Sequence, residues 1–217
     1  MQKIINGYLQ FKESGFKERK NLFEKLSNSQ SPEVLFITCS DSRIDPNLIT
    51  QTEPGDLFVI RNAGNIVPPH TAESDGIVAS IEFAVVALDV KHIVVCGHSN
   101  CGAMKGALNT SGLTALPKVK GWLNYCSDAV TIVQSRKNNL KSDELNSVTQ
   151  ENVLLQIRRL EQYPEISKRL VAGDIKIHGW VYEIGDGTIK CFNQKNTNLS
   201  SYKKFFLAKK LSSNALY

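Results

Sequence analysis

Four short runs of apolar and β-branched residues stand out along the chain, three of them bounded by Gly, Pro or polar clusters. Their ranges are 34–39, 56–62, 92–96 and 175–181. Runs of this length and composition predict β-strands. The turn-forming residues 183–188 follow the fourth run and predict an antiparallel fifth strand.

Helical periodicity separates the second and third of these runs. Apolar residues recur three and four positions apart after Ser74, a candidate N-cap, and predict a helix over residues 74–88 with one core-facing side. Residues 122–133 and 151–160 have the same pattern. Strands that alternate with helices predict an α/β fold: a mostly parallel central β-sheet of four strands plus an antiparallel edge strand, flanked by helices.

The first part of the chain has apolar residues along one side of helices that precede the first strand. Ile4, Tyr8 and Phe11 fall at helical spacing, and a second group of this kind follows them. We therefore expect an N-terminal helical arm over residues 1–27. Its apolar side needs a surface to cover, which is either the chain's own sheet or a neighbouring subunit.

Length, composition and charge exclude several classes of protein. The 217 residues, 41% of them hydrophobic, suffice for one core, so residues 1–217 are predicted to form a single domain. The net charge of +5 arises from 26 basic and 21 acidic residues that are interspersed, and no nucleic-acid partner is expected. No apolar stretch has the length of a membrane span, and no secretory signal is recognised. Five cysteines do not form a disulfide framework, which favours a cytoplasmic protein.

The most informative residues are two cysteines and a histidine near the ends of predicted strands. Cys39 ends the first run, and His98 and Cys101 follow the third. Two thiolates and an imidazole suit Zn²⁺, and three protein ligands leave the fourth tetrahedral position for water, as in catalytic zinc sites. Taken alone, each residue is equally consistent with a buried cysteine or a core histidine. Asp41 and Arg43 beside the first thiol favour the joint metal site, because a core cysteine needs no such neighbours.

Longer motifs surround these residues. They are Cys39-Ser40-Asp41-Ser42-Arg43, the segments 54–65 and 96–104, and Ile177-His178-Gly179-Trp180. On these motifs the chain resembles the β-class carbonic anhydrases, in particular the plant, algal and cyanobacterial branch, which includes carboxysome-associated enzymes. The resemblance implies a Zn²⁺ enzyme that hydrates carbon dioxide to bicarbonate and a proton by attack of a zinc-bound hydroxide. It also implies a homodimer or higher homo-oligomer in which the arm wraps a neighbouring subunit.

The resemblance assigns four further residues to the substrate. Gln30 matches a glutamine that hydrogen-bonds the substrate or bicarbonate oxygen, and Phe58, Ala63 and Phe83 match positions that line the apolar carbon dioxide pocket. Two of them depart from the family pattern, since related enzymes commonly carry tyrosine at Phe83 and a bulkier residue at Ala63. The missing hydroxyl puts one hydrogen bond near Gln30 in question, and the smaller side chain widens the pocket.

Asp41 and Arg43 have a role that follows from the chemistry of the metal. We expect Asp41 to accept a hydrogen bond from the zinc-bound hydroxide, while Arg43 keeps Asp41 ionised and away from the metal. The alternative is an ordinary ion pair. Another branch of the family has tryptophan where Phe36 stands here, and uses it in an extra bicarbonate site that accompanies closure of the centre. We therefore expect this chain to rest open.

Two other functions are consistent with a zinc site. One is hydrolysis of a carbon dioxide isostere, CS2 or COS, on the same scaffold. The other is a non-catalytic zinc-dependent assembly protein. The combination of Gln30, Asp41 and Arg43 has no purpose in an assembly protein, so the sequence favours catalysis.

Overall fold

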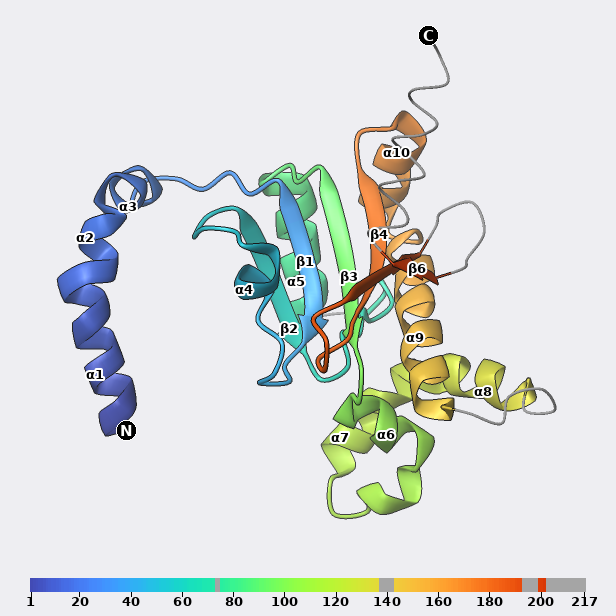
Figure 1. The fold of residues 1–217 in the computed structure, drawn as a ribbon. Coiled ribbons are helices and arrows are strands. Elements are labelled where there is room, and N and C mark those ends of the chain that lie inside the picture. The colour runs from blue at the N-terminus through green and yellow to red at the C-terminus, as the bar shows by residue number, and fades with distance from the viewer. Residues whose placement is uncertain (73–74, 137–142, 193–198, 202–217) are drawn as a thin grey trace, which may run out of the picture. The chain divides into compact units, whose positions relative to one another are not determined.

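The computed structural model describes residues 1–72, 75–136, 143–192 and 199–201, and its chain forms two compact units. The first unit comprises Met1–Ser31 and the second Pro32–Tyr217. Each unit has its own internal packing (Figure 1).

The N-terminal unit is helical, as its apolar pattern predicts. It consists of α1 (Gln2–Gln10), η1 (Phe11–Gly15), α2 (Phe16–Glu18) and α3 (Lys20–Leu26). Three aromatic rings hold it together, with Phe16 stacked on Phe23 at a centroid distance of 5.3 Å and Phe11 edge-on to both. Ile4 and Tyr8 on α1 are more than half exposed, at 67% and 60%. The apolar side of α1 is therefore left uncovered by the rest of its own unit.

The second unit is built on a six-stranded sheet in the order β2-β1-β3-β4-β5-β6. The strands are β1 (Val34–Cys39), β2 (Leu57–Asn62), β3 (His92–His98), β4 (Lys176–Tyr182), β5 (Ile189–Phe192) and β6 (Leu199–Ser201). The first four in spatial order are parallel, and β5 pairs antiparallel with β4. This confirms the predicted four parallel strands with an antiparallel neighbour. The short β6, which pairs antiparallel with β5, adds a strand that the sequence analysis does not predict.

Alternation along the strands fills two hydrophobic clusters, one on each face of the sheet. Leu35 and Ile37 of β1 enter the first cluster with residues of α5, α9 and α10, whereas Phe36 enters the second with residues of α6, α7 and α8. In Figure 1, α5 runs behind the strands and α4 lies in front of them. The helices are α4 (Pro46–Thr50), α5 (Gly76–Glu82), η2 (Phe83–Ala87), α6 (Gly102–Leu108), η3 (Thr110–Leu113), α7 (Pro117–Leu123), η4 (Asn124–Cys126), α8 (Ser127–Ser135), α9 (Glu144–Leu160) and α10 (Pro164–Ala172).

Two predicted helix boundaries are wrong. The helix expected over residues 122–133 is broken, because α7 ends at Leu123 and a 3₁₀ turn precedes α8. Apolar positions on both sides of the break enter the same cluster, so their spacing hides it. The helix expected to start at residue 151 begins at Glu144, where the Asp143 carboxylate accepts a hydrogen bond from the Asn146 backbone N–H. Mostly polar residues in its first two turns conceal this start.

The helix expected over residues 74–88 is present as α5 followed by the π-helical turn η2. Ser74, its expected cap, lies outside the described residues. Asp75 caps α5 instead, accepting from the Ile77 backbone N–H at 2.7 Å.

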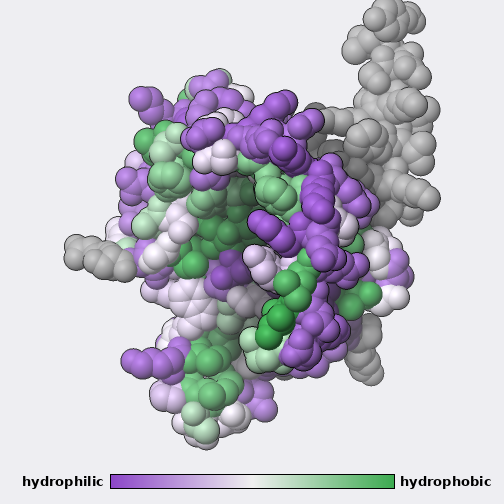
Figure 2. All heavy atoms as spheres, turned by 90° about the vertical axis from the view of Figure 1, so that its left-hand side faces the viewer, coloured by the Kyte–Doolittle hydropathy of each residue, from purple (hydrophilic) through white to green (hydrophobic). Residues whose placement is uncertain are grey.

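Large apolar side chains also reach the surface of the second unit. Leu48 and Val86 are 68% and 62% exposed, and Phe83 is 48% exposed. Hydrophobic side chains are visible among polar ones on the face drawn in Figure 2. Isolated exposed apolar residues are common, but Phe83 and Val86 lie three positions apart and expose apolar side chains on the same turn, η2.

Candidate metal centre

Strand geometry brings Cys39 and His98 to the same edge of the sheet. Cys39 is the last residue of β1 and His98 the last residue of β3, and the two strands are parallel neighbours. The strand order also switches here, because β2 lies on one side of β1 and the next strand, β3, lies on the other side. Open α/β sheets bind their ligands at such a point, beyond the carboxyl ends of the strands.

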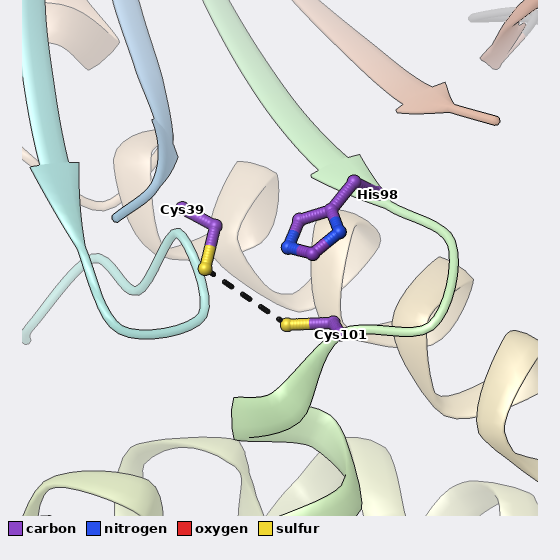
Figure 3. A group of neighbouring side chains, drawn as sticks. All are labelled: Cys39, His98 and Cys101. Atoms are coloured by element: carbon purple, nitrogen blue, oxygen red, sulfur yellow. Dashed lines mark hydrogen bonds between the residues drawn. The ribbon is translucent and has the colours of Figure 1, made fainter. Parts of the chain in front are cut away.

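Cys101 reaches the same point through a tight turn. Asn100 adopts a left-handed conformation with φ of 57°, and Cys101 then serves as the N-terminal boundary residue of α6. The ligand atoms of Cys39, His98 and Cys101 all lie within 4.8 Å of one another, and all three residues are buried (Figure 3). This is the one group of three or more metal-ligating side chains that the described part of the chain brings together.

The His98 imidazole presents a lone pair to the two sulfur atoms. Its Nδ1 is 2.9 Å from the Ser99 carbonyl oxygen, which can only accept, so Nδ1 carries the proton. In the neutral ring, Nε2 is therefore the unprotonated nitrogen. It is buried and has no hydrogen-bond partner among the described residues. A buried acceptor without a partner is costly, and a metal ion would satisfy it.

The two thiols provide the charge that a cation would neutralise. Their sulfur atoms are 4.0 Å apart, near the ~3.8 Å expected between two thiolates on a tetrahedral zinc ion. A hydrogen bond from the Cys101 thiol lowers the pKa of Cys39 well below its usual range. That same bond to Cys39, together with burial, raises the pKa of Cys101. Without a cation, one thiol ionises and the other stays protonated. A Zn²⁺ ion would stabilise both as thiolates, so the two sulfur atoms and one nitrogen fit this metal.

Arg43 holds Asp41 beside this group. Its Nε donates to Asp41 Oδ1 at 2.8 Å and its Nη2 donates to Oδ2 at 2.7 Å, while the Asn100 carbonyl accepts a further bond from the same guanidinium. These hydrogen bonds from Arg43 lower the pKa of Asp41 well below its usual range. Asp41 Oδ2 also lies 3.8 Å from His98 Nε2, so an ionised carboxylate faces the ligand group.

Two residues without an assigned role in the sequence analysis support Cys39. The Arg61 guanidinium donates to the carbonyl oxygens of Cys39, Asp41 and Ile44 at 3.1, 2.8 and 2.9 Å, which fixes the turn after β1. The Gly64 backbone N–H donates to the Cys39 sulfur at 3.4 Å. A glycine just after a strand is a signal that could have indicated Gly64. No sequence signal marks Arg61, whose place in the strand pattern is that of a surface residue.

The residues assigned to the substrate are less closely grouped. The rings of Phe58 and Phe83 pack with centroids 6.0 Å apart. Ala63 precedes Gly64, and its carbonyl oxygen accepts a hydrogen bond from the Trp122 indole at 2.8 Å. Gln30 belongs to the N-terminal unit. The structure thus brings the three candidate ligands, Asp41 and Arg43 together, and the pocket residues stay a prediction.

Among the described residues, every helix is too short or too polar to traverse a lipid bilayer.

Comparison with known proteins gives a consistent result. The carbonic anhydrase family model matches residues 34–189. A carbonic anhydrase of Synechocystis is 48% identical over 195 residues, which cover 89% of this chain and 71% of that protein. One from Pseudomonas aeruginosa is 43% identical over 87% of this chain and 86% of its own length. These matched regions include both clusters of candidate ligands.

Solved structures extend the likeness to the fold. The structure of the β-carbonic anhydrase CcaA has a TM-score of 0.90 and 45% sequence identity, and the match covers 93% of this chain and 91% of that one. A β-carbonic anhydrase of Sordaria macrospora, described as tetrameric, has a TM-score of 0.78 and 32% identity over 88% of this chain and 96% of that one.

Proposed function

The chain belongs to the β-class carbonic anhydrases, zinc enzymes that hydrate carbon dioxide reversibly to bicarbonate and a proton, and we propose that Cys39, His98 and Cys101 hold its zinc ion. The observation that carries this assignment is the buried His98 Nε2, which faces two thiols 4.0 Å apart and has no hydrogen-bond partner among the described residues. The carbon dioxide isostere and assembly alternatives are not favoured.

The chemistry that zinc supplies at such a site is a water whose pKa is low enough for it to act as a nucleophile near neutral pH. Asp41 accepts a hydrogen bond from this nucleophile and directs its lone pair at the substrate carbon. Arg43 keeps Asp41 ionised at this task, because its two hydrogen bonds lower the pKa of the carboxyl group. The same two bonds orient both carboxylate oxygens toward the guanidinium, so Asp41 does not become a fourth protein ligand.

Substrate binding is assigned to four further residues. Gln30 donates a hydrogen bond to an oxygen of carbon dioxide or bicarbonate, and Phe58, Ala63 and Phe83 form an apolar wall that admits carbon dioxide. The packing of Phe58 against Phe83 supports a shared wall for those two. Ala63 lies beside the residue that contacts Cys39. Phe83 lacks the hydroxyl that related enzymes commonly carry at this position.

The enzyme acts as a homodimer or higher homo-oligomer, in which residues 1–27 form an arm that covers a neighbouring subunit. Three observations support this proposal. Ile4 and Tyr8 on α1 are largely exposed, Phe83 and Val86 expose an apolar patch, and the Sordaria relative is described as tetrameric. Its partners are thus carbon dioxide, bicarbonate and copies of itself, with no nucleic acid or membrane.

The cytoplasm is the proposed compartment, with or without carboxysome association. Cys39 and Cys101 are both free and buried thiols, and both must stay reduced to bind zinc. A reducing compartment maintains such thiols.

Stopped-flow hydration of carbon dioxide by zinc-loaded protein tests the reaction. Parallel assays with CS2 and COS, each also added as a competitor, test the isostere alternative. We expect rapid hydration of carbon dioxide and little turnover of either sulfur compound. Faster turnover of CS2 or COS than of carbon dioxide would assign the chain to the isostere hydrolases.

A further inference from the structure

Trp122 on α7 reaches the loop that follows β2. Its indole Nε1 donates to the Ala63 carbonyl oxygen at 2.8 Å, and its ring packs edge-on against Tyr125. Trp122 is half-buried and belongs to the second hydrophobic cluster. No part of the reaction described above uses it.

The Ala63 carbonyl shares a peptide group with the Gly64 N–H. In a planar trans peptide the C=O and N–H point in opposite directions, so a bond accepted at one end fixes the direction of the other end. The other end points at the metal centre, because Gly64 N–H donates to the Cys39 sulfur at 3.4 Å. Trp122, one peptide group and the Cys39 sulfur therefore form a continuous chain of hydrogen bonds. Hydrogen bonds in such a chain polarise and strengthen one another.

The loop is built so that this peptide cannot turn away. Gly64 has φ of +89°, and a Cβ at this position would lie 3.0 Å from Met104 Cε and 3.1 Å from Ala103 Cβ. On the far side of Gly64, the buried Asn152 amide donates to the Gly64 carbonyl oxygen at 2.9 Å. Asn152 is itself held by Gln156 at 2.7 Å. Helices α7 and α9 thus fix the peptides on both sides of Gly64.

We propose that Trp122 is a positioning residue for the metal centre: its indole N–H orients and polarises the Ala63–Gly64 peptide, whose N–H hydrogen-bonds the Cys39 thiolate. The inference rests on the ligand role proposed for Cys39. A hydrogen bond to a metal-bound thiolate stabilises its negative charge and reduces the charge it donates to the metal. Loss of the indole N–H weakens this bond, so the Cys39 sulfur is held less firmly in place for the metal and its lone pair rises in energy.

The test removes the indole N–H of Trp122 and keeps an aromatic side chain at position 122. One variant is Trp122→Phe, and a second carries 3-benzothienylalanine at position 122, which keeps the bicyclic shape and replaces the indole N–H by sulfur. Trp180→Phe is the matched control, because Trp180 is the only other tryptophan of the chain and is also half-buried. Zinc affinity is measured by chelator competition, and the Co²⁺-substituted proteins are examined by absorption spectroscopy.

We expect both Trp122 variants to bind zinc about tenfold more weakly than the wild type. Their thiolate-to-cobalt charge-transfer bands should move to longer wavelength, because the sulfur lone pair is raised in energy when its hydrogen bond weakens. The Trp180→Phe protein should match the wild type in both measurements. The thermal midpoints of the metal-free proteins report packing separately.

Three outcomes would overturn the inference. Unchanged affinity and bands in both Trp122 variants would remove Trp122 from the metal centre. A change in Trp122→Phe alone, with the benzothienyl protein like the wild type, would show that the ring matters through packing; if Trp122→Phe fails to fold, the benzothienyl protein decides alone. A wild-type Co²⁺ protein without thiolate charge-transfer bands would instead contradict the ligand assignment, so the two failures are distinguishable without any assay of turnover.

Discussion

Arg43 binds both carboxylate oxygens of Asp41, at 2.8 and 2.7 Å, while one of those oxygens lies 3.8 Å from Nε2 of His98. The carboxylate is thus close enough to the candidate metal position to become a ligand, and the guanidinium opposes that. Arg43 is half-exposed, and exposed ion pairs contribute little to the stability of the fold. The function of this ion pair is therefore to hold the Asp41 carboxylate in one orientation.

Arg43→Ala should release Asp41 to coordinate the metal and lower the hydration rate roughly 10–100-fold. A crystal structure of the zinc-loaded variant near neutral pH should show an Asp41 oxygen on the metal in place of water, and Arg43→Lys should retain part of the activity. A crystal structure of the wild type near neutral pH with Asp41 on the metal and Arg43 turned away would contradict this description.

The pH dependence of the wild type follows from the lowered pKa of Asp41. A carboxyl group whose pKa is lowered in the folded protein stays ionised as the pH falls through its usual range near ~3.9, so Asp41 itself does not titrate between pH 8 and 5. Activity should therefore fall towards acid pH as a single-proton curve, set by protonation of the nucleophile. Arg43→Ala raises the pKa of Asp41 towards its usual value. A steep, multi-proton loss of activity in the wild type would show that this chain closes cooperatively despite Phe36.

Cys101→Ser should lose bound zinc and hydration activity together, because a neutral hydroxyl replaces a thiolate ligand. Cys126→Ser is the matched control. Cys126 is also fully buried, but burial raises its pKa to about 12, so it stays a thiol and lies outside the ligand group. Elemental analysis should find about one zinc per chain in the wild type and the control. Full zinc occupancy in Cys101→Ser would require a different ligand set.

Gly64→Ala should weaken zinc binding and destabilise the fold by about 1–3 kcal/mol, because the left-handed φ strains any side chain and the Cβ would crowd Met104 and Ala103. Gly121→Ala on α7 is the control, since a Cβ there meets nothing within 4 Å and alanine favours a helix by ~0.5–1 kcal/mol. Denaturant unfolding with and without zinc measures both. Equal stabilities of the two variants would show that the loop can relax around residue 64.

Deletion of residues 1–25 should lower the oligomeric state or cause aggregation, because it removes the exposed apolar side of α1 and uncovers the surface that it is proposed to cover. Light scattering with size-exclusion chromatography measures this. Ile4→Ser combined with Tyr8→Ser should act in the same direction, whereas Lys12→Ser should not. A truncated enzyme with an unchanged oligomeric state and normal activity would show that the arm is dispensable.

The sheet could be predicted from sequence because its strands are short apolar runs with clear boundaries, and because parallel strands deliver Cys39 and His98 to one edge. The ends of helices were harder to predict where tertiary packing overrides the local pattern of apolar residues, as at the break before α8. β6, only three residues long, carries too little signal to be recognised.

Within the site, the three candidate ligands could be predicted from the sequence, because few other functions need two cysteines and a histidine near strand ends. Trp122 could not be predicted from the sequence, because its indole contacts a backbone carbonyl that any residue possesses. Gly64 was marked only as a glycine after a strand, and its backbone N–H carries no signal for a bond to Cys39. Arg61 holds three carbonyl oxygens that come together only after the turn has formed.

Titration of metal-free protein with zinc, followed by stopped-flow hydration of carbon dioxide at each point, tests the central claim most directly. We predict that activity rises linearly from near zero and levels off at about one zinc per chain. Activity that is absent at full zinc loading, or present at full strength before zinc is added, would contradict the assignment of this chain as a zinc-dependent carbonic anhydrase.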